Sequence, residues 1–126
     1  MPPSEKESLS LLQPFLVFQI YIPSGKALHI EVAVQDVDRV KRRIIFHSGA
    51  SKGIVINHLH ARVPIKQFKR DQWVNLSIDI FAFAHYCFKG IEVQSIELIQ
   101  LTSTCKVRKI FSMRSPLLDD DIQTNP

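Results

Sequence analysis

The chain has 126 residues, of which 45% are hydrophobic and 22% charged, a balance typical of globular proteins that excludes wholesale disorder and collagen-like or low-complexity sequence. This length favours a single domain. The net charge of +4 conceals an asymmetry, because residues 36–114 hold 14 Lys and Arg against 6 Asp and Glu, whereas the two ends are acidic. Such a basic body attracts polyanionic partners without choosing between nucleic acid, acidic protein segments and membrane surfaces.

The sequence also favours a cytoplasmic protein. No stretch of about 18 apolar residues occurs, so a membrane-spanning helix is excluded. The N-terminus carries Glu5, Lys6 and Glu7 and lacks the small-residue cleavage pattern of a secretory signal. Cys87 and Cys105 are the only cysteines, too few for a disulfide framework or a four-thiolate zinc site. We therefore expect no disulfide, no structural metal and no cofactor.

The hydrophobic pattern divides the chain into a central domain at residues 13–114 and two flexible tails, at 1–12 and, acidic in character, at 115–126. Within the domain, apolar residues recur at every second position, as in Leu28 and Ile30, which is the period of a half-buried strand. Strands are predicted at 15–22, 28–35, 40–47, 54–63, 74–80, 93–101 and 105–112. Seven short strands indicate an all-β, antiparallel β-sandwich.

One segment shows helical spacing instead. Its apolar positions follow the i, i+3, i+4, i+7 pattern of an amphipathic helix. These positions are Ile80, Phe83, Ala84, Cys87 and Phe88. Asp79 can cap the start, and Gly90 can adopt the left-handed conformation that commonly ends a helix. We expect this short helix to close one end of the sandwich.

No catalytic machinery is recognisable in the sequence. There is no glycine-rich phosphate loop, no nucleophile elbow and no His-Glu-x-x-His motif. Asp71 and Asp79 are the only acidic residues between positions 39 and 91, which leaves no evident pair of carboxylates for acid–base chemistry. We therefore predict that the protein is not an enzyme and has no small-molecule substrate.

His58 and His60 lie two positions apart in a predicted strand and so point to one face, where both could bind a metal ion. Arg62 shares that face and would repel a cation, and no third ligand follows by spacing. An exposed polar strand face is the favoured interpretation. Cys87, near His85, is interpreted as a small apolar residue of the helix.

Clusters of Lys and Arg are the strongest candidates for a partner-binding site. The candidate residues are Lys41, Arg43, Lys66, Lys69, Arg70, Lys106 and Arg108. Because successive side chains of a strand alternate between faces, Lys41 and Arg43 are expected on one face and Arg42 on the other. Ordinary solubilising charge is the alternative interpretation. Trp73, beside Arg70, is either a platform for a partner or a residue that covers the core.

Six segments between Pro14 and Ser112 resemble, in this order, the cilia- and flagella-associated protein 20 domain family. They are PFLVFQIYIP, VKRRI, LHARVPIKQFKRDQWVNLSIDIFAF, FKG, QSIELI and TCKVRKIFS. Each segment is weak alone, but together they are fairly specific, and they are more similar to the longer, domain-containing members than to the short ones. Matching positions include Phe15, Leu16, Val17, Arg42, Arg43, Trp73, Asn75, Cys105, Arg108, Lys109 and Phe111.

The resemblance implies a β-sandwich of jelly-roll or carbohydrate-binding-module type, without catalytic residues, that makes protein contacts at axonemes or centrioles. Tubulin or axonemal proteins would be its partners, and the cytoskeleton of the cilium its location. Family members carry a longer N-terminal part with additional strands, which implies that this chain is N-terminally shortened and its sandwich incomplete. A nucleic-acid-binding module that uses the basic strands is the alternative function. Sugar binding follows from fold analogy alone, and no membrane contact is expected.

Overall fold

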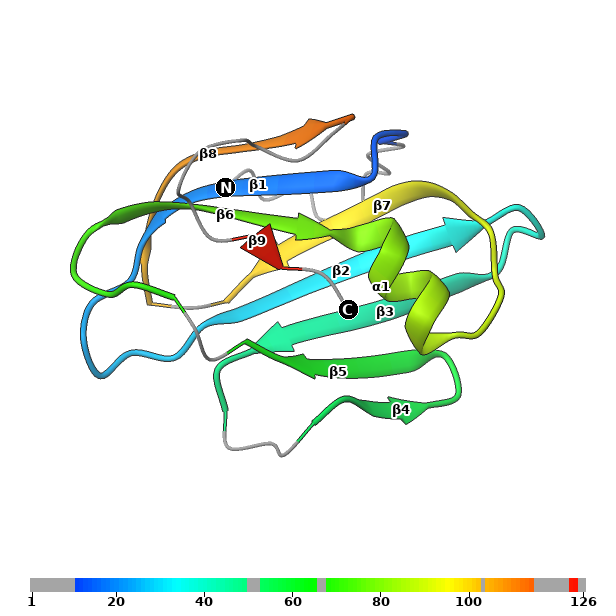
Figure 1. Ribbon diagram of the computed structural model, residues 1–126, viewed down its shortest axis with the longest axis horizontal. Helices are drawn as coiled ribbons and strands as arrows, with labels where there is room; N and C mark the ends of the chain where they lie inside the picture. Colours follow the sequence, from blue (N-terminus) through cyan, green and yellow to red (C-terminus); the bar gives the residue numbers. More distant parts are fainter. Residues whose placement is uncertain (1–10, 50–52, 66–67, 103, 115–122, 125–126) are drawn as a thin grey trace.

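Two β-sheets stacked face to face form the fold (Figure 1). The computed structural model describes residues 11–49, 53–65, 68–102, 104–114 and 123–124. Within these residues, one sheet has four strands in the order β8-β1-β6-β9 and the other has five in the order β4-β5-β3-β2-β7. The elements are β1 (Phe15–Tyr21), β2 (His29–Asp36), β3 (Lys41–His47), β4 (Val55–Asn57), β5 (His60–Pro64), β6 (Trp73–Asp79), α1 (Ile80–Cys87), β7 (Val93–Leu101), β8 (Lys106–Met113) and β9 (Gln123–Thr124). The predicted all-β sandwich with one short helix is confirmed.

The core lies between the sheets because the central strands alternate apolar positions with outward-facing ones. Leu16, Phe18 and Ile20 of β1 are completely buried, as are Ile30 and Val32 of β2. Burying a side chain of this size contributes roughly 1.5–3 kcal/mol to folding. Because a slip of one residue would turn such side chains away from the core, their burial favours the observed register of these strands.

The prediction of a single strand at 54–63 is wrong. The chain instead forms β4, turns at His58 and Leu59, and returns as β5 with Asn57 opposite His60. His58 adopts a positive φ of 55°, a conformation that polar residues tolerate better than β-branched ones. This segment contains no glycine or proline to mark the turn, so its apolar alternation resembles one continuous strand.

Two strand pairs are parallel, within the sandwich that the sequence predicts to be antiparallel. β5 lies between β3 and β4 in the sheet. The β4–β5 hairpin reverses the chain, so that β5 runs antiparallel to β4 and parallel to β3. β9 runs parallel to β6. Both pairings join segments that a local sequence pattern cannot relate to each other.

Both predicted tails contain residues that pair with the sheets. Leu11 forms an antiparallel bridge with Ile96 of β7 through two backbone hydrogen bonds of 2.9 and 2.8 Å. Gln123–Thr124 forms β9 beside β6. Pairing therefore extends beyond the predicted domain bounds, because the edges of β7 and β6 offer unpaired N–H and C=O groups. Most other residues of the two tails lie outside the described ranges.

The predicted helix is present and is capped as expected. The Asp79 carboxylate accepts a hydrogen bond of 3.1 Å from the backbone N–H of Ala82, and Gly90 has a φ of +80° beyond the last turn. Phe83 packs edge-on against Phe46 of β3, with ring centres 5.1 Å apart. The helix thus closes one end of the sandwich over the five-stranded sheet (Figure 1).

A buried ion pair fastens the turn between β2 and β3. Asp36 is 3% exposed, and its carboxylate accepts hydrogen bonds from the backbone N–H groups of Asp38 and Val40, both at 2.9 Å, and from the Arg42 guanidinium. That guanidinium also lies over the Phe88 ring, 5.5 Å from its centre. Burial alone would raise the pKa of Asp36, but hydrogen bonds from Val40, Arg42 and Asp38 hold the pKa below its ordinary value of 3.8.

Replacing Asp36 by Asn should lower the free energy of unfolding at pH 7 by about 3 kcal/mol, because Arg42 would keep its charge in a largely buried position without a counter-ion. The ionised Asp36 contributes its full stabilisation above pH 3.8, and this is lost as the pH falls through the lower folded-state pKa. The variant should therefore show a weaker pH dependence below 3.8. Denaturant titrations at several pH values measure both effects.

Asp38→Asn, in the same turn, is the control and should change stability by no more than about 0.5 kcal/mol. Equal losses of stability in the two variants would contradict the stabilising role of the Asp36–Arg42 ion pair.

Candidate functional site

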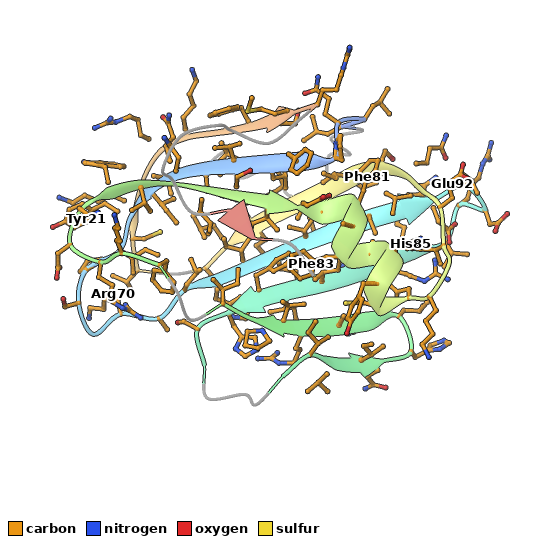
Figure 2. The ribbon with its side chains drawn as sticks, viewed as in Figure 1. Tyr21, Arg70, Phe81, Phe83, His85 and Glu92 are labelled. Atoms are coloured by element: carbon orange, nitrogen blue, oxygen red, sulfur yellow. The ribbon has the colours of Figure 1, made fainter. Side chains whose placement is uncertain are left out.

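The structure divides the predicted basic residues into two groups. The loop before β6 and the start of β8 meet at one end of the sandwich, where the last residue of β1 lies between them. Figure 2 labels Tyr21 and Arg70 at this end. We call this surface the basic end, and its described members are Tyr21, Lys69, Arg70, Trp73, Lys106 and Arg108. Lys41 and Arg43 form the second group, on β3, and Lys66 lies outside the described residues.

Two aromatic rings and two cations contact one another at the basic end. Tyr21 is in register with Trp73 on one side and with Lys106 on the other. The two rings meet edge-on with their centres 5.9 Å apart. The Lys106 Nζ lies 5.4 Å from the centre of Tyr21, and the Arg108 Cζ lies 4.3 Å from the centre of Trp73. Cation–π contacts therefore hold both cations against the sheet surface.

A β-bulge explains how Arg108 reaches across a strand. The register of β8 against β1 shifts between Gln19 and Ile20, which leaves Arg108 as the extra residue. A bulge re-aims the side chain of such a residue. Its guanidinium extends past β1 to Trp73 of β6, which remains 40% exposed. Stacking uses the face of the guanidinium and leaves its in-plane N–H groups able to bind a carboxylate.

The loops that border the basic end are fastened to each other. The Asp71 carboxylate accepts hydrogen bonds from the Oγ and the backbone N–H of Ser24, the latter at 2.9 Å, and these two bonds lower the pKa of Asp71. The backbone N–H of Asp71 donates to the carbonyl of Ile22 at 2.9 Å, and Arg70 donates to the carbonyl of Lys26. Asp71, the acidic residue nearest in sequence to Trp73, is thus already hydrogen-bonded to the loop that contains Ser24.

The second basic group is partly neutralised. Arg43 forms an ion pair with Glu31 of the neighbouring strand, and Lys41 is exposed on the same face of β3. Arg42 points to the opposite face, as the alternation predicts, where it pairs with Asp36. Arg42 is therefore a structural residue, and replacing it would test stability rather than binding.

The other candidate chemistry finds little support in the described residues. His58 lies in a turn with a positive φ, whereas His60 begins β5, so the two residues do not share a strand face as the spacing predicted. No group of three His, Cys, Asp or Glu side chains suited to a metal ion occurs among the residues described. Cys87 is buried and Cys105 half-buried, and burial raises the pKa of both thiols, which disfavours the reactive thiolate. No helix in the described ranges is long and apolar enough to cross a membrane.

Sequence reasoning did not identify Tyr21 and Ser24 as parts of this surface. Tyr21 ends an apolar strand and resembles a core residue, and only the pairing of β1 with β6 and β8 brings it between Trp73 and Lys106. Ser24 lies 47 positions from its partner Asp71. No local signal relates residues at such separations.

Replacing Arg108 by Ala should uncover one face of Trp73 and raise its accessibility to the quencher acrylamide. Trp73 is the only tryptophan of the chain, so its fluorescence reports on this site alone. Stability should fall by no more than about 1 kcal/mol, the range of an exposed cation–π contact. Lys109→Ala is the control, since its Nζ lies over Phe111, 5.7 Å from the ring centre. An equal increase in quenching for both variants would argue against the stacked arrangement.

Comparison with known protein families agrees with the resemblance found in the sequence. The family model described as CFA20 domain matches residues 1–125. The match covers nearly the whole chain, and the chain therefore belongs to the CFA20 domain family. The family name associates the domain with cilia and flagella.

Proposed function

We propose that this member of the CFA20 domain family is a noncatalytic protein-interaction module of ciliary microtubules that binds an acidic segment of tubulin or of an axonemal protein. The observation that carries the proposal is the contact of Lys106 with Tyr21 and of Arg108 with Trp73, two rings that also meet each other, at the basic end. Family membership supports the ciliary setting. The site would act by docking, since the described residues present no catalytic arrangement.

The composition of the basic end suits a protein partner. Trp, Tyr and Arg are the residue types that contribute most often to the energy of protein interfaces. Arg108 is held by stacking before any partner arrives, which reduces the conformational entropy lost on binding. Lys69 and Lys106 are exposed and add charge, and Lys106 lies over the Tyr21 ring. The arrangement therefore fits an acidic polypeptide segment, with Arg108 as its geometrically defined contact.

Nucleic acid is a weaker candidate for the same surface. Proteins that bind single strands stack successive bases on open aromatic faces. The Arg108 guanidinium already lies over the ring of Trp73, and Tyr21 meets Trp73 by an edge and lies beneath Lys106. A nucleic acid would thus contact charge more readily than aromatic surface, and the experiment below distinguishes the two partners.

Reversing the charges of Lys106 and Arg108 together, to Glu, should weaken co-sedimentation with microtubules about tenfold or more, because each exposed pair lost is worth up to about 1 kcal/mol. The matched control is the double reversal of Lys41 and Arg43, which changes the net charge equally on the other sheet. The sequence alone also proposes Lys41 and Arg43 as contacts, so a larger loss for this second pair would move the site to β3.

Two further measurements separate the partner classes. Proteolytic removal of the acidic tubulin tails should weaken binding of the native protein and leave little additional effect for the Lys106 and Arg108 reversal. Binding to DNA or RNA of any sequence, with the same dependence on these two residues and on salt, would favour the nucleic-acid alternative. If charge reversal and tail removal both leave sedimentation unchanged, acidic tubulin tails are not the partner.

A further inference from the structure

β8 is an edge strand of the four-stranded sheet and, among the described residues, pairs on one side only. Its partner there is β1, and its other side lies at the margin of the molecule (Figure 1). Edge strands carry a row of unpaired backbone N–H and C=O groups that can pair with a further strand. β8 has eight residues, Lys106–Met113, and is therefore long enough to accept one.

The pairing of β1 identifies which backbone groups of β8 point to the open side. The Ile80 N–H donates to the Pro14 carbonyl at 2.9 Å, in the same register as the β1–β6 pairs. Hydrogen-bonded and non-hydrogen-bonded pairs alternate along an antiparallel ladder, so even-numbered residues of β1 bond to β6 and odd-numbered ones to β8. The β8 residues opposite the even-numbered positions direct their N–H and C=O groups outward. They are Val107, Ile110 and Ser112.

The core-facing side of this edge is apolar and incompletely covered. Val107 stands opposite Ile20 and Ile110 opposite Phe18, so both lie on the face of the sheet that meets the core. Val107 is nevertheless 45% exposed, and Ile110 is half-buried. Apolar side chains of an added strand would therefore continue the core at this edge.

The outer face of β8 is cationic, and the bulge increases its charge. Lys106 and Lys109 stand opposite odd-numbered residues of β1, whose side chains point away from the core. Regular alternation from Lys109 would direct Arg108 to the core-facing side. The bulge instead makes Arg108 an extra residue, and its guanidinium reaches Trp73 on the outer face. β8 itself contains no acidic residue.

We propose that the open edge of β8 accepts an extended segment of another protein as an additional strand, in which acidic and apolar residues alternate. The carboxylates of this segment face Lys106, Arg108 and Lys109. Its apolar side chains lie beside Val107 and Ile110. The ciliary identity of the partner rests on the proposed function, whereas the strand addition itself does not.

Charge and alternation distinguish this occupant from three others. A second copy of β8 would bring the cations of two chains close together, and like charges opposite each other in a sheet are destabilising. A uniformly acidic segment would direct half of its carboxylates toward Val107 and Ile110. Nucleic acid can bind the cations but does not provide the regular N–H and C=O ladder of a polypeptide strand.

Amide hydrogen exchange of the full chain, measured by NMR with a synthetic peptide, tests the strand addition residue by residue. In the peptide, which is as long as β8, glutamate and valine alternate; the matched control has the same composition with the glutamates in one block. The alternating peptide should slow exchange at Val107, Ile110 and Ser112 about tenfold or more, because these outward amides gain ladder hydrogen bonds. Lys109 and Phe111, whose amides point to β1, are the internal controls.

Two results of this measurement would overturn the proposal. One is the absence of selective slowing at the outward amides with the alternating peptide. The other is equal slowing with the block peptide, which would show that net charge alone determines binding.

A proline variant tests the role of the backbone at the same edge. Val107→Pro removes one outward N–H at an edge position, where proline is tolerated. It should weaken binding of the alternating peptide about tenfold, measured by fluorescence anisotropy, whereas Val107→Ala retains the N–H and should weaken it by no more than about threefold. Thermal unfolding checks that both variants are folded, and the exchange measurement on the native chain decides the question if the proline variant is not. Equal losses in two folded variants would contradict strand addition.

The outcomes keep the added strand and the proposed function apart. Selective protection of the outward amides, with no variant co-sedimenting with microtubules, would support the added strand and reject the proposed function. Co-sedimentation that depends on Lys106 and Arg108, without selective protection, would support the function and reject the added strand. Protection that appears without peptide and rises with protein concentration would identify a second copy as the occupant. Single-stranded DNA that binds where the peptide does not would identify nucleic acid, and either result would overturn the proposal.

Discussion

The register of β1 against β6 and β8 positions the aromatic and cationic residues of the basic end. Leu16, Phe18 and Ile20 are completely buried, and a slip of one residue would turn all three away from the core between the sheets. At roughly 1.5–3 kcal/mol for each side chain, such a slip would cost far more than the ~1 kcal/mol of an exposed cation–π contact. The core therefore determines the register, and Tyr21 is brought beside Lys106 as a consequence.

Basic residues serve two distinct purposes in this fold, and burial separates them. Arg42 is paired with a buried carboxylate that also binds two backbone N–H groups, so removing either partner leaves an uncompensated charge at a cost of about 3–5 kcal/mol. Arg108 is exposed and stacked on a ring, where its net contribution to stability is small. A cation that contributes little to folding but has a defined geometry is well suited to bind a partner.

Most of the strands and the helix were predictable because each depends on a short-range pattern. The alternation of β2 and β6, the nearly continuous apolar run of β1 and the cap formed by Asp79 need only the side chains of one segment and their neighbours. The β4–β5 turn was missed because His58 takes a positive φ without a glycine nearby. The division of the cations into two groups was missed because it depends on pairing between distant strands. Counting charges along the sequence also does not show that Arg43 forms an ion pair with Glu31.

Salt dependence distinguishes electrostatic recognition at the basic end from recognition by shape. Lys106 and Arg108 are exposed, and salt screens exposed charges over about 10 Å at 0.1 M, so it weakens their contact with an acidic partner. A steep decrease of affinity with salt is therefore consistent with electrostatic recognition, whereas a shallow decrease indicates recognition by shape.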